Sequence, residues 1–490
     1  AVILFLTALQ FTLVRGLRYT RTVVGHKAAG HLKAHTHTRK YPRMLMALVE
    51  SECLIGGRKQ PVSLTHEEFR AGRHVIAVAD IVGAKLHKSE SKSFFEVYAY
   101  PKVASCGGGP GKRSASHLTV EVPNGTQPGA DRYVEEIRRL VHPEMNRRFL
   151  VFVNPVGGQG QAEYIFETIA RPLLEQSNVD FDVVVTNRAG HAKDMVAERG
   201  DLGSFSAVLV FGGDGLLYEV VQGIDQRPDS ETIFQSLPLS PICAGSGNGL
   251  CKSVLFESGE DFGKLEAVFV AVKGRPQPLD LSRVTTPASS ALGFLGLGWA
   301  IWSDVDIESE RWRALGSARF TVGALQRIIF LREYQGRLSY LPPSAAAGSP
   351  TASVPPLSEP VPSDWVTIED AFVLVTVLQT SHAAHDMHSA PGSTLDDGEF
   401  TILVLRSTVG RWQLLSMFLA MEDGTHLANP ALEVFKAQAY RLEPATHPGT
   451  LALDGEIIEY GPVQGRLLPG AARVLSLSPN AEQFSPLDRG

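Results

Sequence analysis

The chain has 490 residues, 44% hydrophobic and 20% charged, an ordinary balance for a globular protein of two or three domains. A net charge of -6 excludes a general attraction to nucleic acid or to an anionic bilayer, so any membrane contact must be local. The 4 cysteines lack zinc-ligand spacing and indicate a reducing, intracellular setting. They are Cys53, Cys106, Cys243 and Cys251, and the last two are expected to be small core residues.

Residues 1–39 form an N-terminal segment of uncertain role that opens with an apolar run over residues 1–14. This run is too short for a membrane span and lacks the basic flank and cleavage site of a signal peptide. We expect one or two buried strands here, or an artefact of gene prediction, and no transmembrane segment in the chain. The first residue is alanine rather than methionine, which indicates an incomplete or processed sequence.

Residues 40–145 are predicted to form a small β domain. Strand-like runs at residues 74–78, 94–100 and 117–122 precede an amphipathic helix at about residues 131–141. Several strands closed by one helix fit a β-barrel of the pleckstrin-homology type.

Residues 146–285 alternate between apolar strands and helices, which predicts a parallel α/β sheet. The expected strands are residues 149–153, 181–185 and 207–211, and the expected helices are residues 162–175, 191–198 and 216–224. The first strand is apolar throughout, which is typical of a strand covered on both faces.

Residues 286–480 contain more strand-like runs and fewer helices, which predicts an antiparallel β-sandwich domain. The clearest runs are residues 372–378, 400–405 and 451–460. Residues 342–362 are rich in Pro, Ser and Ala and cannot bury a core, so they are predicted to be a flexible insertion.

Three apolar runs of the α/β block each lead into a glycine-rich turn and then a helix. The turns lie at residues 154–160, 212–215 and 244–249. In a parallel sheet such turns gather at the carboxyl ends of the strands, where their glycines and free N–H groups favour phosphate. One such turn is commonly only a tight connection, whereas three on successive units indicate a nucleotide site. The P-loop and dinucleotide fingerprints both fail, because the first turn lacks lysine and Leu250 replaces the third glycine.

Asp214 is the candidate catalytic residue of the middle turn, Gly212-Gly213-Asp214-Gly215. A carboxylate at a helix start is commonly an N-cap, which requires no function. In an ATP site it would instead lie near the terminal phosphate and accept or orient the proton of an attacking hydroxyl. Glu219, five residues on, is expected either at the same site or facing solvent.

Six segments resemble the diacylglycerol-kinase catalytic domain family and, within it, the sphingosine kinases. They are FGGDGLLYEVVQG (211–223), AGSGNGL (244–250), SDVDIESERWRALGSARF (303–320), GRLSYLP (336–342), FLAM (418–421) and LDGEIIEYGPVQ (453–464). Together they are specific, whereas each alone is not. The resemblance implies an ATP- and Mg²⁺-dependent kinase that converts a sphingosine-type base to sphingosine 1-phosphate. It also implies a nucleotide site between the α/β and β domains.

The resemblance also implies roles for individual residues. Asp214 matches the proton acceptor for the substrate hydroxyl, with Gly212, Gly213 and Gly215 at substrate positions beside it. Asp306 matches the acid that contacts the head of the lipid base, where a carboxylate favours an ammonium over a neutral diacylglycerol. Asp304 could share that task. The nucleotide positions fall on Asn154, Pro155, Val156, Thr186, Asn187, Arg188, Ala189, Gly190, Glu219, Gly245, Ser246, Gly247, Arg313, Arg319, Asp454, Gly455 and Glu456.

Local pattern offers simpler explanations for some of these positions. Apolar alternation around residues 454–456 predicts a hairpin turn without any function. The stretch 303–320 could be a capped helix with Glu308 and Glu310 in its first turn, which the resemblance outweighs for Asp306 only. Arg313 and Arg319 are six residues apart, so a helix break near Gly316 is needed for both to reach one ligand.

The resemblance implies an apolar tunnel for the lipid tail. Its lining positions fall on Phe320, Leu374, Met387, Phe418, Met421 and His426, although a buried His426 is commonly a satisfied core histidine. Smaller or unusual residues stand at the aligned positions Thr376, Ala383, Ala324 and Trp302, which leaves tail length and base preference open. Three further departures are Gly212 for serine, Tyr218 for histidine and Gln159 for a basic residue.

Three functions remain open at this point: a sphingosine kinase, a kinase for ceramide, diacylglycerol or another lipid alcohol, and a lipid-binding scaffold on the kinase fold. The presence of Asp214, Asp306, Arg313 and Arg319 argues against the scaffold. We expect a cytoplasmic protein in transient peripheral contact with membranes, without a nucleic-acid partner. The sequence leaves open the metal ligands, the mechanism of membrane targeting and whether the chain forms a homodimer.

Overall fold

The computed structural model describes residues 46–477, apart from residues 89–92, 104–110, 124–125, 127, 145, 158–159, 316–317 and 344–353 and the side chains of residues 313–315. The expectations for residues 1–39, Cys106 and Gln159 therefore fall outside the described residues.

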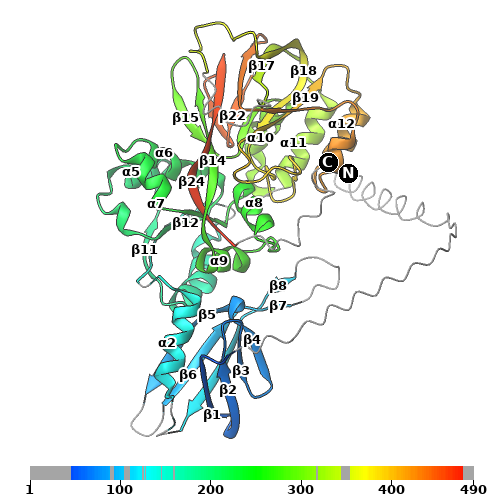
Figure 1. The fold of residues 1–490 in the computed structure, drawn as a ribbon. Coiled ribbons are helices and arrows are strands. Elements are labelled where there is room, and N and C mark those ends of the chain that lie inside the picture. The colour runs from blue at the N-terminus through cyan, green and yellow to red at the C-terminus, as the bar shows by residue number, and fades with distance from the viewer. Residues whose placement is uncertain are drawn as a thin grey trace, which may run out of the picture. The chain divides into compact units, whose positions relative to one another are not determined.

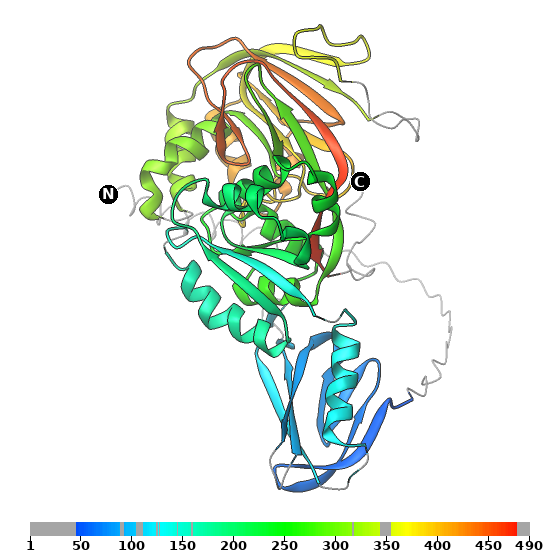
Figure 2. The same ribbon diagram turned by 90° about the vertical axis from the view of Figure 1, so that its left-hand side faces the viewer.

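The first described elements form a seven-stranded antiparallel sheet in the order β4-β3-β2-β1-β9-β6-β5. The strands are β1 (Val49–Ile55), β2 (Arg58–Leu64), β3 (Glu68–Ala71), β4 (His74–Ala77), β5 (Ile81–Lys88), β6 (Ser93–Ala99) and β9 (Ser116–Val122). Helix α2 (Ala130–Val141) lies along the sheet (Figure 2), and the ring of Tyr133 stacks on Phe95 at 5.1 Å. The predicted strands and helix are confirmed to within a residue, whereas a pleckstrin-homology relationship stays a prediction.

A parallel sheet follows, in the order β11-β10-β12-β13. Its strands are β10 (Arg148–Val153), β11 (Asp180–Val185), β12 (Ala207–Gly212) and β13 (Leu239–Cys243). Its helices are α3 (Ala162–Ile165), α4 (Arg171–Gln176), α5 (His191–Glu198), α6 (Asp214–Asp225), α7 (Ser230–Ser236), α8 (Gly249–Glu257) and α9 (Lys264–Lys273), with a π-helical turn η2 (Phe166–Ala170) between α3 and α4. The predicted α/β alternation is confirmed, and strands β10, β12 and β13 lie in one buried core, whereas the edge strand β11 is partly exposed.

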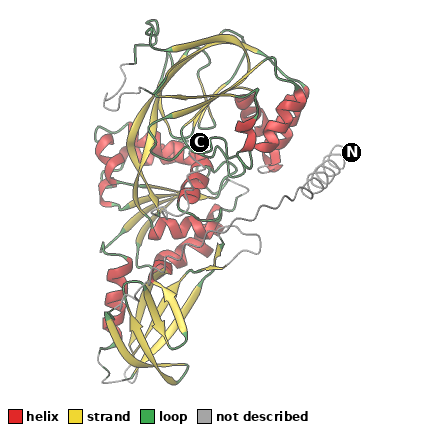
Figure 3. Cartoon of the chain, turned by 45° about the vertical axis from the view of Figure 1, so that its right-hand side comes forward, coloured by secondary structure: helices red, strands yellow, loops and turns green. Residues whose placement is uncertain are grey.

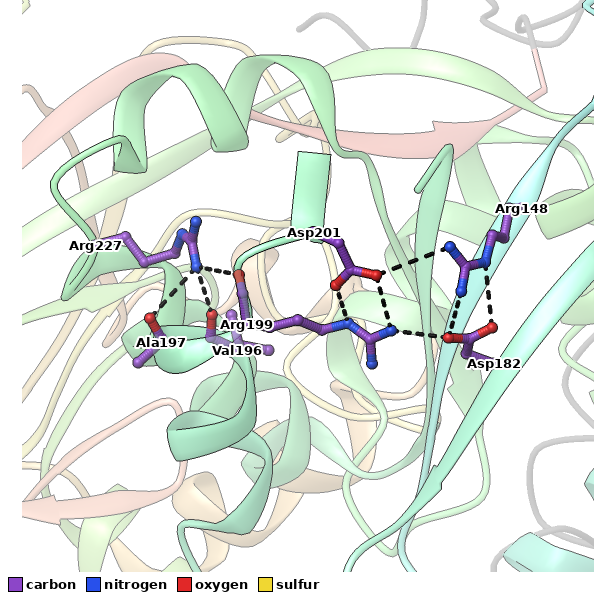
Figure 4. A network of polar contacts seen from close by, with 7 residues as sticks. All are labelled: Arg148, Asp182, Val196, Ala197, Arg199, Asp201 and Arg227. Atoms are coloured by element: carbon purple, nitrogen blue, oxygen red, sulfur yellow. Dashed lines mark hydrogen bonds and ion pairs between the residues drawn. The ribbon is translucent and has the colours of Figure 1, made fainter. Parts of the chain in front are cut away.

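A network of ion pairs connects β10, β11 and the segment after α5 (Figure 4). Asp182 of β11 accepts from Arg148 of β10 at 2.7 Å and from Arg199 at 2.8 Å. Arg199 also pairs with Asp201 at 2.6 Å. Arg227, just past α6, donates to the carbonyls of residues 196, 197 and 199 at 3.0, 3.4 and 2.8 Å. These bonds satisfy carbonyls that the end of α5 leaves without helical partners. They also fix the end of α5 relative to the end of α6.

The C-terminal part is built mainly from antiparallel strands (Figure 3). They are β14 (Arg275–Thr285), β15 (Ser290–Gly293), β16 (Gly296–Ala300), β17 (Tyr334–Leu341), β18 (Val366–Leu378), β19 (Phe400–Arg406), β20 (Glu433–Ala437), β21 (Ala439–Pro444), β22 (Leu451–Leu453), β23 (Glu456–Ile458) and β24 (Val463–Ser476). The helices between them are α10 (Ile301–Glu308), α11 (Ala318–Ile329) and α12 (Arg411–Ala420), with the 3-10 turns η4 (Ser309–Leu315) and η5 (Thr425–Ala428). The predicted antiparallel β character is confirmed.

Strand β24 connects this part with the parallel sheet. It pairs antiparallel with β14 and β21, and at its end Val474 pairs parallel with Leu239 of β13. Figure 1 shows β24, in red, running beside β14 from one part to the other. The two layers therefore share one continuous sheet, which holds the carboxyl ends of the parallel strands against the C-terminal elements.

Part of the predicted flexible insertion is anchored. Arg441 of β21 is buried, and its guanidinium donates to the carbonyls of Pro356 at 3.0 Å and of Glu359. Gln464 donates to the carbonyl of Pro355 at 2.8 Å. The expectation of flexibility for residues 342–362 therefore does not hold for residues 355–359, because these carbonyls have buried partners. Residues 344–353 lie outside the described part.

An ion cluster joins the N-terminal sheet to the end of α8. Arg113, in the short strand β8 (Lys112–Arg113), donates to both oxygens of Glu260 at 3.0 and 2.6 Å. It also donates to Asp80 at 3.0 Å, and its guanidinium lies 3.4 Å from the ring centroid of Phe269. Glu260 is fully buried, so this pairing is screened little by solvent.

Candidate functional site

The three glycine-rich turns meet at the carboxyl ends of β10, β12 and β13. The amide of Asn154 donates to the carbonyl of Phe211 at 3.0 Å, and the amide of Asp214 donates to that of Gly247 at 3.2 Å. A Cβ added at Gly245 would lie 2.2 Å from the Cα of Gly213, a distance that no side-chain carbon tolerates. Glycine is therefore required where the second and third turns touch. The sheet thus brings the predicted nucleotide segments together.

The first turn and the segment after β11 lie side by side. The Asn154 side chain accepts from the amide of Val156 at 3.2 Å, which folds an Asx turn and leaves Pro155 and Val156 partly or largely exposed. Thr186 is buried and its amide donates to the carbonyl of Val153 at 2.8 Å. The following residues Asn187, Arg188 and Ala189 are exposed. Their surface is available to a ligand at this edge of the sheet.

Asp214 caps a helix, but not the helix that it begins. Its Oδ2 accepts from the amide of Gly249 at 2.8 Å and its Oδ1 accepts from that of Leu250 at 3.3 Å, both in the first turn of α8. Burial raises the pKa of Asp214 to about 6, against the lowering effect of these two bonds. The carboxylate is thus held in one orientation between α6 and α8 and titrates close to neutrality. An N-cap of α6, the simpler expectation, is not what the structure shows.

Glu219 caps a second helix. Its Oε1 accepts from the amide of Gly190 at 2.8 Å and its Oε2 accepts from that of Ala192 at 3.1 Å. Gly190 has a φ of 75° and immediately precedes α5. Glu219 therefore holds the end of the segment 186–190 through its bond from Gly190, and it does not simply face solvent. Its negative charge is favourable at the N-terminus of α5.

The turn between β22 and β23 is anchored by its own aspartate. Asp454 and Gly455 both have positive φ, 52° and 86°, as a two-residue hairpin turn requires. The Asp454 carboxylate accepts from the amides of Phe294, Leu295 and Gly296 at 2.8, 2.9 and 2.9 Å. Burial raises its pKa to about 7 despite these bonds, with Asp214 adding to the rise. The hairpin is therefore structural and, at the same time, fixed beside Asp214.

Acidic side chains from three parts of the chain converge on this point. A Cβ added at Gly215 would lie 2.8 Å from Oε1 of Glu456, and one added at Gly455 would lie 3.5 Å from Oδ2 of Asp306. Burial raises the pKa of Asp306 to about 7, and the charges of Glu456 and Asp214 add to the rise against the effect of Arg319. The Asp306 side chain remains 25% exposed. Such a concentration of carboxylates favours a cationic ligand.

Asp304 does not share the role expected of Asp306. It is buried, accepts from the hydroxyl of Tyr334 at 2.7 Å, and lies 3.7 Å from Arg327 and 3.6 Å from Arg332. The two arginines also pair with Glu308. The Asp304 carboxylate is therefore engaged by Tyr334, Arg327 and Arg332, which argues against a ligand contact beside Asp306.

Arg319 lies next to Asp306 with one unused donor. Its guanidinium is 4.0 Å from the Asp306 carboxylate, donates to the Asp306 carbonyl at 3.4 Å, and pairs with Glu310. The Nε of Arg319 is buried without a hydrogen-bond partner among the described residues. Helix α10 gives way to the 3-10 turn η4, kinked at Trp312, before α11 begins at Ala318. The break expected near Gly316 stays a prediction, because Gly316 and the Arg313 side chain lie outside the described residues.

The predicted tail positions gather around one apolar cluster, here called the tail cluster. It contains Leu374 and Ala324, with Phe320, Phe418, Trp302 and Ala383 packed against it from α10, α11, α12 and the loop after β18. Met421 is buried, and its carbonyl accepts from the amide of His388 at 2.8 Å, next to Met387. His426 is buried and donates to the carbonyl of Ser389 at 3.0 Å, while its Nδ1 has no partner in the described part. Thr376 is bonded to the Leu297 carbonyl at 3.2 Å.

The acids of the site are also the residues that bear on metal binding. In the described part of the chain, no group of three or more His, Cys, Asp or Glu side chains could hold a metal ion by itself. The charges of neighbouring acids raise the pKa of Asp306 and of Asp454. Mg²⁺ is commonly bound by one or two carboxylates together with phosphate oxygens, and Asp306 and Glu456 are carboxylates of that kind.

Asn248 lies in the motif AGSGNGL, where the sequence alone indicated no role for it. Its side chain donates to the carbonyl of Gly245 at 2.8 Å and accepts from the amide of Gly245 at 3.3 Å. This closes the third turn on itself and aims the first amides of α8 at Asp214. The available signal was an asparagine directly before a helix start, which is a common N-cap. Cys243 and Cys251, on either side of this turn, are buried and free, as expected.

Comparison with known proteins places these features in a family. The family model described as diacylglycerol kinase catalytic domain matches residues 148–284, and that described as YegS C-terminal NAD kinase beta sandwich-like domain matches residues 303–476. Sphingosine kinase 1 of Mus musculus is 38% identical over 343 residues, 66% of this chain and 89% of that protein. Sphingosine kinase 1 of Arabidopsis thaliana is 32% identical over 355 residues, 68% and 72% respectively. A solved diacylglycerol kinase from Bacillus anthracis str. Sterne is 18% identical, with a TM-score of 0.46 over 70% of this chain and 100% of its own.

Proposed function

We propose, because this chain belongs to the sphingosine kinase family, that it transfers the γ-phosphate of ATP to the primary hydroxyl of a sphingosine-type long-chain base. The observation that carries the proposal is the Asp214 carboxylate. It is buried, held by the first amides of α8, and placed where three glycine-rich turns meet. A neutral side chain could cap the helix without the cost of a buried charge. Burial raises the pKa of Asp214 to about 6, which suits a residue that accepts a proton.

In the proposed reaction the substrate oxygen attacks the γ-phosphorus, the bond to the β-phosphate oxygen breaks, and ADP leaves. The hydroxyl proton passes to Asp214, whose two bonds from Gly249 and Leu250 keep its carboxylate aimed at one position. In-line phosphoryl transfer depends mainly on such positioning and on neutralisation of phosphate charge. The turns supply backbone N–H groups for this, and Arg319 supplies its unpartnered Nε.

The bound metal, when present, would neutralise phosphate charge and orient the nucleotide. Glu456 is the carboxylate that we place beside it, because it lies against the first turn of α6. Asp306 is assigned to the ammonium of the base, since its partly exposed carboxylate lies against Gly455, next to Glu456 in the β22–β23 hairpin. The tail cluster would receive the hydrocarbon tail, with Phe320 and Phe418 at its edge.

A kinase for ceramide or diacylglycerol is the alternative, and Asp306 separates the two. A carboxylate gains little from a neutral head group and must still be desolvated, whereas an ammonium offsets that desolvation. The aspartate at this position therefore favours the charged base.

The test offers labelled ATP with sphingosine, ceramide and diacylglycerol to the wild type and to two variants. We expect phosphate transfer to sphingosine, and a fall in kcat of about 10²- to 10⁴-fold in Asp214→Asn, the range of a lost general base. Asp306→Asn should raise KM for sphingosine and leave the low activity towards ceramide unchanged. Asp225→Asn is the matched control on the same helix, because Asp225 pairs with Arg283 instead of the site. Full activity of Asp214→Asn in a folded protein would refute the assignment.

We also propose that the protein contacts membranes through the outer ends of α11 and α12. Ile329 and Phe330 are 62% and 67% exposed, and Trp412 and Leu419 of α12 are 82% and 59% exposed. Arg411 donates to the carbonyl of Ile329 at 3.4 Å, which ties the two helix ends together. No helix of the described residues is long and apolar enough to cross a bilayer. An exposed apolar group that includes tryptophan favours the interface region of a lipid surface.

A further inference from the structure

Helix α8 touches both the proposed catalytic residue and the proposed tail region. At its start, the amides of Gly249 and Leu250 hold the Asp214 carboxylate. One turn later, Ser253 is completely buried and faces the loop that follows β18. The Ser253 hydroxyl accepts from the amide of His382 at 3.1 Å and donates back to the carbonyl of Gly249 at 3.0 Å. A single side chain thus lies between the loop and the first turn of the helix.

The loop after β18 is tied in turn to the tail positions. The amide of Ala383 donates to the carbonyl of Met387 at 3.1 Å, and the amide of His388 donates to the carbonyl of Met421 at 2.8 Å. Ala383 packs against the tail cluster. If a bound tail displaced this loop, the peptide of His382 would move as well, and that peptide is the one bonded to Ser253.

The loop after β18 packs tightly against the start of α8. A Cβ added at Gly249 would lie 2.6 Å from the carbonyl oxygen of Ala383 and 3.0 Å from that of His382. Backbone therefore packs on backbone here, and the Ser253 hydroxyl is the side-chain group of α8 that bonds both to the peptide of His382 and to the first turn of the helix. Phe256 and Glu257, farther along α8, contact the loop at His382, His388 and Leu395 without bonding to that first turn. Packed interiors transmit such displacements because they contain few voids.

We propose that Ser253 is a positioning residue that couples the tail region to Asp214, so that a tail of full length improves the placement of the catalytic carboxylate. The inference rests on the proposed function, since it assumes that Asp214 takes the proton and that the tail cluster receives the tail. Ser253 touches neither substrate nor nucleotide in this scheme. It acts through Gly249, whose amide is one of the two that orient Asp214.

The test compares sphingoid bases with eighteen-carbon and twelve-carbon chains in wild type, Ser253→Ala and Ser253→Cys. We expect kcat for the long base to fall about tenfold in Ser253→Ala, the size of effect that a lost buried hydrogen bond produces. The values of kcat for the short base and KM for ATP should change less than about twofold, because their binding does not pass through this link. Ser253→Cys fills the same space but hydrogen-bonds weakly, so it should resemble Ser253→Ala.

Ser177→Ala is the matched control. Ser177 is also buried and donates to the carbonyl four residues back, at 2.7 Å, but its hydroxyl bonds only within its own helix end. It should leave the dependence of kcat on tail length unchanged, and thermal unfolding measures any common loss of stability.

The possible outcomes separate the inference from the function. If Ser253→Ala or Ser253→Cys keeps the wild-type ratio of long-base to short-base kcat, the coupling is refuted while the kinase assignment stands. A cysteine variant equal to wild type beside an impaired alanine variant would show a packing role and would also overturn the proposal. A wild type that transfers no phosphate to either base, or an active Asp214→Asn, would overturn the proposed function and this inference with it.

Discussion

At the scale of single residues, the carboxylates of the site differ in what they are bonded to, and the bonds separate their roles. Asp304 has a tyrosine hydroxyl and two arginines around it, and Asp454 has three amides. Asp306 keeps part of its side chain exposed next to Arg319. Only Asp214 lies buried at the meeting point of the glycine turns with its oxygens on helix amides. The bonds therefore identify Asp304 and Asp454 as structural anchors, and they leave Asp214 and Asp306 for the proposed roles of proton acceptor and contact to the base.

The pH dependence of the reaction follows from two of these residues. Burial raises the pKa of Asp306 to about 7 and that of Asp214 to about 6, and both are needed as carboxylates. Each is protonated below its pKa, so kcat/KM for the base should fall as the pH drops through 7, and more steeply below 6. In Asp306→Asn the upper step should disappear. Rates measured between about pH 5 and 9 give the apparent values for the coupled pair. A flat profile down to pH 5 would contradict this explanation.

At the scale of elements, two helices of the site are capped at their N-termini by acidic side chains of a neighbouring helix. Asp214 of α6 caps α8, and Glu219 of α6 caps α5. Helix α6 therefore helps to position two segments that contain predicted nucleotide-binding residues. Each start offers free amides, which stabilise a carboxylate from another element as readily as a phosphate.

Glu219→Gln tests this arrangement. The amide oxygen of glutamine accepts one bond, so the second amide at the start of α5 loses its charged partner, a loss of about 1 kcal/mol. We expect KM for ATP to rise about three- to tenfold because the segment 186–190 loosens, with kcat little changed. Steady-state kinetics and denaturant unfolding measure the two effects. Asp225→Asn, on the same helix, should lower stability without changing KM for ATP, and an equal rise there would contradict the assigned role.

At the scale of the whole molecule, the described chain is joined across its parts by strand pairing and by buried ion pairs. Strand β24 continues the parallel sheet into the antiparallel strands, and Arg113 pairs with the buried Glu260 near the end of α8. The tail cluster lies under α11 and α12, whose outer faces carry exposed apolar side chains.

The combined variant Phe330→Ala, Trp412→Ala tests the membrane contact. Removing two apolar side chains that would be buried at the interface should weaken binding to phospholipid vesicles more than about tenfold. The kcat measured on detergent-dispersed base should stay within about twofold, since neither side chain reaches the site. Vesicle sedimentation provides the measurement, with Val366→Ala, Val434→Ala as a control at exposed positions of β18 and β20. Unchanged sedimentation of the first variant would rule out this surface.

The sequence by itself determined the kinds of elements and the family. Alternating apolar runs and glycine turns predicted β10, β11, β12 and the helices after them, because period and turn chemistry are local properties. Six motifs were enough to indicate the kinase family. The individual nucleotide, substrate and tail positions remain predictions.

Only the tertiary structure decided how the acids are used and how the parts are joined. Asp214 could not be assigned to α8, nor Asp304 to Tyr334, because each bond joins residues about thirty positions apart that no local pattern relates. The same holds for β24, whose pairing with β13 spans more than two hundred residues. Helix α8 contacts both Asp214 and the loop after β18 for the same reason, because its sequence determines a helix and the fold supplies both neighbours.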